Sequence, residues 1–566
     1  MSSTAVNNVE RPFASTTVFL TLLVPVLGLF YIYWYVSRRQ MIELADKIPG
    51  PKGLPIFGNV LELLGNPNEI FNKFYAKSFQ YGRTAKLWVG PRLLIFLTDP
   101  RDVEIILSSH VHIDKSPEYR FFKPWLGDGL LISTGSKWRA HRKLIAPTFH
   151  LNVLKSFIDL FNKNSRETVH KMEKELGKEF DCHDYMSEAT VEILLETVMG
   201  VSKKTQNQSG YDYAMAVMKL CDILHLRHTK LWFRPDIIFN LTNTAKYQKQ
   251  LIKVIHSLTR KVIQKKKTDF ERGIRGSTAE VPDELKSYKT ESNVSNKTNT
   301  LEGTSYGQSV GLKDDLDVDD DDVGERKRMA FLDLMIESSQ NGVVINDEEI
   351  KEQVDTIMFE GHDTTAAASS FFLCQMAAHP DIQARVVKEL DEIFQGSDRP
   401  ATFTDTLEMK YLERCLLETL RLFPPVPIIA RQLQQNVKLA SNQEYVLPAG
   451  ATIIIGTFKI HRLEEIYGPN AEHFNPDNFL PEPAANRHYY SFIPFSAGPR
   501  SCVGRKYAML KLKILLSTIL RSYEIKSNLK ENDYKLQGDI ILKRSDGFRI
   551  MAEKRNFIKE IGCKTV

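Results

Sequence analysis

A cysteine framed by glycines and followed by a helical pattern is the feature that most constrains this chain. Residues 495–504 read F-S-A-G-P-R-S-C-V-G, with Cys502 between Gly498 and Gly504. Glycine allows tight backbone approach around the sulfur, and the residues after Cys502 have the periodicity of an amphipathic helix. We therefore expect Cys502 at a helix N-terminus, where the helix dipole and the unpaired N–H groups favour a thiolate. A buried inert thiol is the alternative for an isolated cysteine.

The other cysteines suggest no competing site. The 566 residues include six cysteines and no C-x-x-C pair, which excludes a disulfide scaffold and a zinc pair of that spacing. With 42% hydrophobic and 26% charged residues, most of the chain can bury a core. Lysine and arginine (75) exceed aspartate and glutamate (70) by only five, so we expect no nucleic-acid partner. A glycine-framed thiolate suits an axial haem ligand.

The cysteine loop resembles the haem-binding signature of the cytochrome P-450 superfamily, F-x-x-G-x-R-x-C-x-G, at every fixed position. The resemblance covers residues 45–555 apart from an insert, and it implies a mainly α fold with small β-sheets, the cytochrome P-450 fold. It makes Cys502 the metal ligand, bound to the iron of haem b, and places Phe495 and Gly498 in the cofactor-binding loop. It also implies an oxidoreductase of the monooxygenase type that uses O2.

Four residues match the contacts that this family makes to the haem propionates. Trp138 and Arg142, in K-W-R-A-H-R-K, are four residues apart and share one helix face. Arg431, in P-I-I-A-R-Q, and Arg500 in the cysteine loop are the other two. Cations are expected there because two buried carboxylates need partners.

The motif E-T-L-R predicts a structural ion pair. Glu418 and Arg421 are three residues apart and therefore lie on one helix face. In the family the matching pair is buried behind the haem and is joined by an Arg from a loop upstream of the cysteine. P-D-N-F, at 476–479, occupies the position of that loop, but the sequence does not identify the third partner.

The segment 346–379 is predicted to be a helix with Asn346 as its N-cap. Gly361 lies in its middle and indicates a close approach or a local bend, because Gly costs about 1 kcal/mol relative to Ala inside a helix. By resemblance, Asp363 and Thr364 are the acid–alcohol pair that passes protons to dioxygen while the O–O bond breaks.

Glu360 lies four residues before Thr364, on the same face of the predicted helix. The string F-E-G-H-D-T-T resembles family 4 of the superfamily, the group of the fatty-acid ω-hydroxylases. In many members the matching Glu is esterified to a haem methyl group. The resemblance thus predicts haem attached covalently through Glu360; a non-covalent polar wall residue is the alternative.

The uncharged run over 18–36 is long enough for one membrane-spanning helix and has aromatic residues at 33–35, where an interface is expected. Arg38 and Arg39 follow it, which places the later residues in the cytosol. A cleaved signal peptide is disfavoured because the run is too long and lacks a small-residue cleavage site. We expect a single-pass protein of the endoplasmic reticulum membrane, with residues 1–17 lumenal and the catalytic domain cytosolic.

The rest of the chain divides into a proline-rich linker (37–60), a haem-thiolate catalytic domain (61–555) and a C-terminal tail (556–566). An insert at 273–327 interrupts the domain; it is polar and then acidic, and we expect it to be flexible and solvated. A calcium site is the alternative, although no glycine and closing glutamate appear at the spacing of an EF-hand.

Periodicity predicts secondary structure in five segments. A second long helix is expected over 247–268, and strands over 85–97 and 451–457. Two further strands are expected within 535–552, joined by a hairpin turn at 545–547.

Three stretches and the acidic insert resemble one insect subfamily of family 4, the oxidative decarbonylases. The stretches are residues 122–133, 141–150 and 486–513. The resemblance implies that long-chain fatty aldehydes become hydrocarbons and carbon dioxide, which supplies the hydrocarbons of the cuticle. Fatty-acid ω-hydroxylation is the first alternative; a reductase-independent haem-thiolate isomerase and a non-enzymatic haem sensor are the others.

The expected electron donor is NADPH-cytochrome P-450 reductase, and the expected substrates are long-chain aldehydes or fatty acids that reach the site from membrane lipid. Segments 119–130 and 424–430 are candidates to line the substrate cavity. A basic patch could bind an acidic flavoprotein, although a solvated helix face is an equal alternative. The residues of this patch are Arg139, Lys143, Lys506, Lys511 and Lys513.

Overall fold

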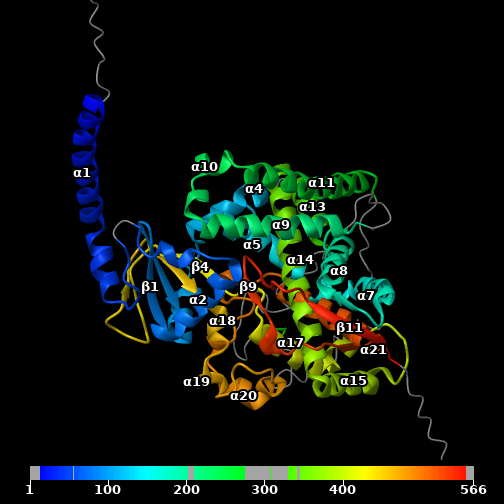
Figure 1. Cartoon of the computed structure of the whole chain (residues 1–566). Helices are drawn as coiled ribbons and strands as arrows, with labels where there is room; N and C mark the ends of the chain where they lie inside the picture. The colour runs from blue at the N-terminus through cyan, green and yellow to red at the C-terminus, as the bar shows by residue number, and fades with distance from the viewer. Residues whose placement is uncertain are drawn as a thin grey trace, which may run out of the picture.

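A helix of 32 residues, α14 (Asp347–Ala378), passes through the middle of the molecule in this computed structural model (Figure 1). Asn346 caps it: its side chain accepts a hydrogen bond from the Glu349 N–H at 2.9 Å, and the Glu349 carboxylate accepts one from the Asn346 N–H. Most side chains of α14 are buried, because helices from both halves of the chain pack around it. The predicted helix over 346–379 is confirmed.

The structure describes residues 13–54, 57–201, 210–273, 306–307, 329–340 and 345–555. Our predictions for residues 1–12, for most of the insert and for the tail 556–566 lie outside these residues. The other helices are α1 (Phe13–Asp46), α2 (Pro67–Gln80), α3 (Pro100–Leu107), α4 (Lys123–Leu126), α5 (Gly135–Ile145), α6 (Leu151–Lys155), α7 (Ile158–Met172), α8 (Cys182–Thr197), α9 (Gly210–Thr229), α10 (Asp236–Asn240), α11 (Asn243–Glu271), α13 (Phe331–Gln340), α15 (Pro380–Phe394), α16 (Phe403–Glu408), α17 (Lys410–Leu422), α18 (Thr457–Ile460), α19 (Glu464–Tyr467), α20 (Pro481–Ala485) and α21 (Arg505–Ser522).

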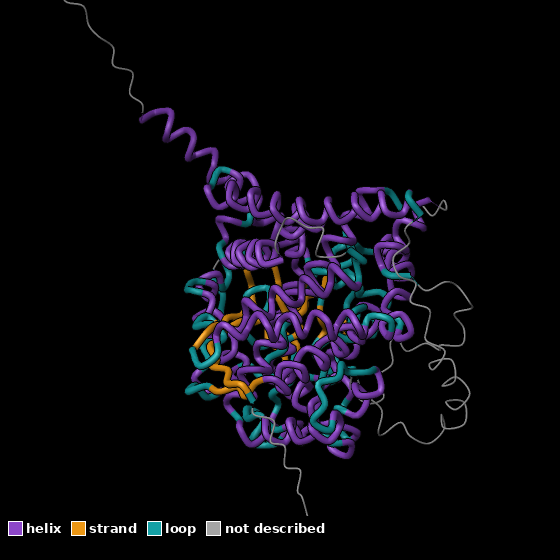
Figure 2. Tube along the Cα trace, turned by 90° about the vertical axis from the view of Figure 1, so that its right-hand side faces the viewer, coloured by secondary structure: helices purple, strands orange, loops and turns teal. Residues whose placement is uncertain are grey.

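Small sheets complete the fold, and Figure 2 shows how little of the trace they occupy beside the helices. The largest sheet has the order β1-β2-β7-β4 and one apolar face that packs on Ala45 and Ile48, at the end of α1 and just after it. A second sheet has the order β3-β11-β8. The mainly α fold with small sheets is therefore confirmed. The strands are β1 (Thr84–Val89), β2 (Arg92–Leu97), β3 (Glu179–Asp181), β4 (Ile429–Gln432), β5 (Val437–Lys438), β6 (Val446–Leu447), β7 (Thr452–Ile455), β8 (Tyr523–Lys526), β9 (Leu536–Gly538), β10 (Leu542–Arg544) and β11 (Arg549–Lys554).

The predicted hairpin at 545–547 is wrong. A turn does connect β10 to β11, but β10 pairs with β9 whereas β11 pairs with β3 and β8. Residues 545–547 therefore carry the chain from one sheet to another. Local turn signals predict a change of direction but not which strands pair: β10 pairs with the preceding β9, whereas β11 also pairs with β3, more than 300 residues earlier.

Helix α1 stands away from the rest of the molecule in Figure 1. It continues to Asp46, ten residues past the predicted span, so the first part of the range 37–60 is helical rather than extended. Among the helices of the described residues, none is both long and apolar enough to cross a membrane. The membrane span over 18–36 stays a prediction.

The pair Glu418–Arg421 is fully buried on α17 and joins this helix to the loops that follow it. The Arg421 guanidinium donates to both carboxylate oxygens at 2.7 Å and also to the carbonyls of His461, Ala471 and His473. The Glu418 carboxylate also accepts hydrogen bonds from the Asn475 N–H at 2.8 Å and the Asn478 side chain at 3.1 Å. Asn478, in P-D-N-F, is thus a third side chain of this network, where the family resemblance led us to expect an arginine.

Replacement of Arg421 by alanine should therefore lower the free energy of unfolding by about 3–5 kcal/mol, because Glu418 would stay buried without its counter-charge. Denaturant unfolding measures this change. Glu43→Ala, which breaks the exposed Arg39–Glu43 pair, is the control and should leave the midpoint unchanged. Equal effects of the two variants would contradict the structural role of the buried pair.

Candidate active site

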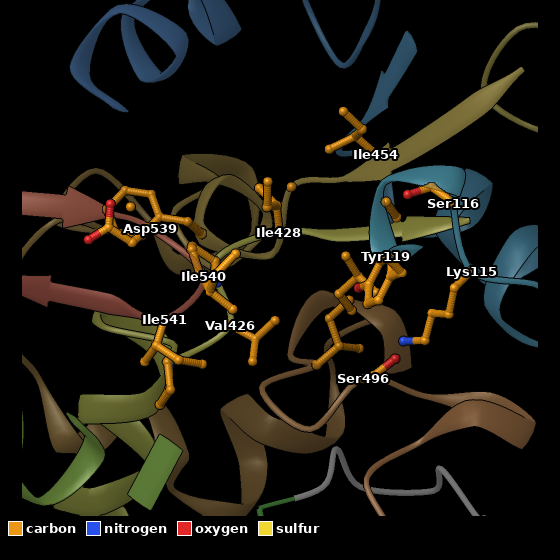
Figure 3. Close-up of a pocket in the computed structure, with 18 of the residues that line it drawn as sticks. Lys115, Ser116, Tyr119, Val426, Ile428, Ile454, Ser496, Asp539, Ile540 and Ile541 are labelled. Carbon is orange, nitrogen blue, oxygen red and sulfur yellow. The ribbon is translucent and has the colours of Figure 1, made fainter. Parts of the chain in front are cut away.

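A cavity of about 580 Å³ lies beside α14, and most of its wall is apolar. Both segments that we predicted as lining contribute to it, with Phe122 and Leu130 from the first and Val426 and Ile428 from the second. Figure 3 shows Lys115, Ser116, Tyr119 and Ser496 on one side of it, and Asp539 to Ile541 on the other. Cys502 and Thr364 also line it, so the predicted thiolate ligand and the predicted proton-relay hydroxyl face the same cavity.

Cys502 lies three residues before α21 and faces this cavity. Its side chain is accessible from the cavity, whereas the other described cysteines, Cys182, Cys221, Cys374 and Cys415, are buried. Burial, and to a smaller extent the charge of Glu360, raises the pKa of the Cys502 thiol to about 11. The Gly504 N–H and the nearby arginines lower this pKa, but by less. The helix terminus alone therefore does not ionise this sulfur. A metal ion does, because a coordinating thiol is deprotonated.

The loop before Cys502 is held by backbone contacts that require its sequence. The Cys502 N–H donates to the Phe495 carbonyl at 2.9 Å. Gly498 has a φ of +70°, and a Cβ there would lie 2.0 Å from the carbonyl oxygen of Leu107, so only glycine fits. Phe495 lines the cavity, whereas Gly498 does not line it and instead lets the loop pack closely against the backbone of Leu107.

Cations gather on the Cys502 side of the cavity. Arg142 donates to the Ser501 carbonyl at 2.8 Å. Arg500 donates to three backbone carbonyls, those of Ile113, Leu130 and Ser133. Its guanidinium carbon also lies 4.7 Å from the centre of the Trp138 ring. Trp138, Arg142 and Arg500 line the cavity. Arg431 is buried behind the wall, and its Nη2 has no hydrogen-bond partner among the described residues.

Lys115 is a further cation of this group, which the sequence did not reveal. Its backbone pairs with that of Arg431 in an isolated β-bridge, and its ammonium lies 4.9 Å from the centre of the Tyr119 ring. Burial lowers its pKa well below the usual value, and the charges of Arg431 and Arg500 lower it further. The positive charge of the buried arginines suits a ligand that carries carboxylates, and carboxylates bound there would also favour the protonated form of Lys115.

Glu360 is the acidic residue that faces these cations. It lines the cavity, one helical turn before Thr364 on α14. Burial raises the pKa of its carboxyl group, although Lys115, Arg500 and Arg142 oppose the shift. Glu360 therefore presents a carboxyl group on the wall of the cavity, four residues before Thr364, and its ester to haem stays a prediction.

Asp363 and Thr364 lie on different sides of α14. Thr364 lines the cavity, with its hydroxyl donating to the Glu360 carbonyl at 2.6 Å. Asp363 is fully buried outside the cavity wall and forms an ion pair with Lys543 of β10 at 2.9 Å. Burial alone would raise the pKa of Asp363, but Lys543, with His362, lowers it. The acid of the predicted pair is therefore held ionised and turned from the cavity by a lysine that the sequence analysis missed.

Lys511 connects α21 to α14. Its ammonium donates to the Gly361 carbonyl at 2.9 Å and to the Thr365 hydroxyl at 2.8 Å, and burial lowers its pKa to about 7. Gly361 itself allows a close approach, since a Cβ there would lie 2.9 Å from Leu194 of α8. The close approach predicted at Gly361 is confirmed, and the Lys511 contact connects the helix of Cys502 to the helix of Thr364.

The predicted basic patch is wrong for two of its five residues. Lys511 is buried as described above, and Lys513 is buried in an ion pair with Glu413. Arg139 and Lys143 are exposed and Lys506 is half-buried. Helical periodicity did not distinguish the faces of α21, because this helix is buried on nearly all sides.

Taken together, these residues fit a haem. Cys502 would hold the iron, the cationic group would hold the propionates, and the apolar wall would cover the ring. The bound haem would supply the activation of dioxygen. The protein would supply the thiolate position, the exclusion of water and, through Thr364 and Asp363, positions at which protons can be held.

We expect Cys502→Ala to abolish the thiolate-type spectrum of the ferrous–CO complex, because no other described cysteine faces the cavity. Absorption spectroscopy of the reduced, CO-treated protein measures this. Cys415→Ala, which removes a buried thiol on α17, should keep the spectrum. A thiolate-type spectrum from Cys502→Ala would refute the assignment.

Lys543→Met should slow turnover by about 10²-fold, because it leaves Asp363 buried without its cation. Burial then raises the pKa of Asp363, so the loss should be greatest at low pH and activity should recover as pH rises. The pH profile of turnover and the hydrogen peroxide released per NADPH consumed measure this. Lys535→Met, at an exposed position before β9, is the control. An unchanged pH profile in Lys543→Met would contradict the role of the pair.

Comparison with known proteins agrees with this site. The family model for cytochrome P-450 matches residues 48–551. Cytochrome P-450 4g15 of Drosophila melanogaster is 60% identical over 563 residues, which cover 95% of this chain and 97% of that protein. Cytochrome P-450 4g1 of the same organism is 48% identical over 96% of each chain, and cytochrome P-450 4V2 of Homo sapiens is 35% identical over 89% of each. The chain therefore belongs to the cytochrome P-450 family, within its family 4, and is a haem-thiolate monooxygenase.

Proposed function

We propose that the protein converts long-chain fatty aldehydes to hydrocarbons by oxidative decarbonylation. The reaction consumes one aldehyde RCHO, one O2, two electrons and two protons, and it yields RH, CO2 and H2O. NADPH supplies the electrons through a reductase. The observation that carries the proposal is the charge of the cavity wall, which favours a neutral head group over a carboxylate.

Cations outside the Cys502 side of the cavity are already paired with acidic residues or lie against a ring. Arg234 is 2.6 Å from Glu118, and Arg83 is 3.0 Å from both Asp99 and Glu465. The remaining lining cations follow the same pattern: Lys86 pairs with Asp46, Lys77 with Glu62, and Lys459 lies over the Tyr75 ring. A fatty-acid carboxylate bound there would have to displace one of these partners.

The opposite wall carries negative charge. Asp539 lines the cavity in the loop between β9 and β10 and lies 3.1 Å from His225, whose pKa burial lowers to about 4. Burial raises the pKa values of Asp539 and Asp222 to about 6, so both are largely ionised at pH 7. With Asp363 these carboxylates share the single charge of Lys543. A carboxylate is repelled from this wall, whereas an aldehyde is not.

The N-terminal helix supports a membrane setting. Large apolar side chains on α1 are exposed, including Leu22, Val26 and Leu29. Exposed apolar surface of this kind is typical of contact with lipid. We infer a single-pass anchor in the endoplasmic reticulum membrane with the catalytic domain in the cytosol, where long-chain aldehydes dissolved in the bilayer can reach the cavity.

The test is reconstitution with an NADPH-dependent reductase in lipid vesicles, with a saturated long-chain aldehyde labelled at its carbonyl carbon. We expect a hydrocarbon one carbon shorter and labelled carbon dioxide, with no product from Cys502→Ala. The acid of the same chain length should bind about tenfold more weakly, measured by the substrate-induced shift of the haem spectrum, because of the anionic wall.

Other products would identify other functions. An ω-hydroxy acid would show a fatty-acid hydroxylase, and turnover without NADPH would show an isomerase. Absence of oxygen consumption with any lipid would indicate a haem sensor. The ester between Glu360 and haem stays a prediction; the mass of the denatured protein decides it.

A further inference from the structure

One turn of the acidic insert lies against the cysteine loop. Between Gly273 and Met329 the structure describes only Tyr306 and Gly307, which form a turn with φ angles of +45° and +78°. Two successive residues in the left-handed region are uncommon, and tyrosine rarely adopts it. Contacts with another part of the chain are therefore needed to keep this turn in place.

Those contacts come from residues nearly 200 positions later. Gly307 lies against the Phe495 ring so closely that a Cβ at Gly307 would be 2.2 Å from Phe495 Cε2. The Arg505 guanidinium donates to the Tyr306 carbonyl at 3.5 Å, and the Tyr306 side chain packs on the main apolar core. The positive φ and the contact with the ring each require glycine at position 307.

Phe495 and Arg505 lie on either side of Cys502 in the sequence. The Phe495 carbonyl accepts the hydrogen bond of the Cys502 N–H, and Arg505 is the first residue of α21. The Phe495 ring and this carbonyl belong to one residue, so the contact that holds the ring also restrains the backbone to which the Cys502 N–H is bonded. A residue that fixes Phe495 therefore acts on the position of the sulfur.

We propose that the turn Tyr306–Gly307 is a positioning element of the cysteine loop, through which the insert controls the geometry of the Cys502 thiolate. Gly307 fixes the Phe495 ring from outside the cavity, and the Tyr306 carbonyl fixes Arg505. The insert thereby contributes to the site through a contact that its polar composition does not predict. This proposal depends on the haem-thiolate site and not on the identity of the substrate.

Gly307→Ala tests the proposal, because the added methyl group must displace the Phe495 ring. In the ferrous–CO complex, we expect the ratio of the form with thiolate ligation to the form without it to be about tenfold lower than in the wild type. Hydrogen–deuterium exchange of the peptide 495–504 should be about tenfold faster, since its contact surface is lost. The exchange measurement needs no turnover and no substrate.

Gly273→Ala is the matched control. Gly273 has a similar φ of +72°, and among the residues that the structure describes no atom beyond its chain neighbours would lie within 4 Å of an added Cβ, so this variant adds the same backbone strain without such a contact. It should retain the wild-type spectrum and the wild-type exchange of peptide 495–504. If Gly307→Ala behaves like Gly273→Ala in both measurements, the proposal is wrong.

Tyr306→Ala provides a second test if Gly307→Ala does not accumulate as folded protein. It keeps the turn backbone but removes the ring that packs on the core. We expect faster exchange in peptide 495–504 and a smaller thiolate-type fraction, in the same direction as for Gly307→Ala. Wild-type values of both would overturn the proposal, whatever the aldehyde assay shows.

Discussion

The buried ammonium of Lys511 determines how the two halves of the site meet. It binds a carbonyl and a hydroxyl of α14 from α21, the helix that begins just after Cys502. Because both helices are buried along most of their length, this contact sets the distance between the Cys502 wall and the Thr364 wall. The remaining side chains of the cavity are arranged around these two helices.

Charge is separated across α14. On the cavity side, Lys115, Arg142 and Arg500 surround Glu360, which leaves an excess of positive charge for a ligand with carboxylates. On the far side, Asp363 is neutralised by Lys543. The same helix thus presents Thr364 to the apolar cavity, next to the cations of the Cys502 side, and Asp363 to a closed ion pair. Consecutive residues on a helix point in different directions, so one segment serves both environments.

Motifs with a local physical cause were predictable from the sequence. The helix at 346–379 followed from its cap and its continuous apolar residues, and the cysteine loop from its glycines. The partners of these motifs were not predictable, because Lys543 and Lys511 lie far away in sequence and no local pattern marks a buried lysine. Lys511 and Lys513 were even expected at the surface, since charge normally indicates exposure. The hairpin at 545–547 failed because β10 pairs with the preceding strand β9, whereas β11 pairs with β3, far away in sequence.

The sequence by itself determined the family, the thiolate residue and the main helix, because each depends on residues that are close together in the chain. Tertiary structure decided which charges are neutralised. Lys543 neutralises Asp363, and Arg421 neutralises Glu418, which also accepts a hydrogen bond from Asn478. Acidic partners such as Glu118 neutralise cations that line the cavity. Tertiary structure also decided that a turn of the insert lies on Phe495. Most of these outcomes depend on distances between segments far apart in the chain, and the pairing is favoured because a buried charge without a partner is costly.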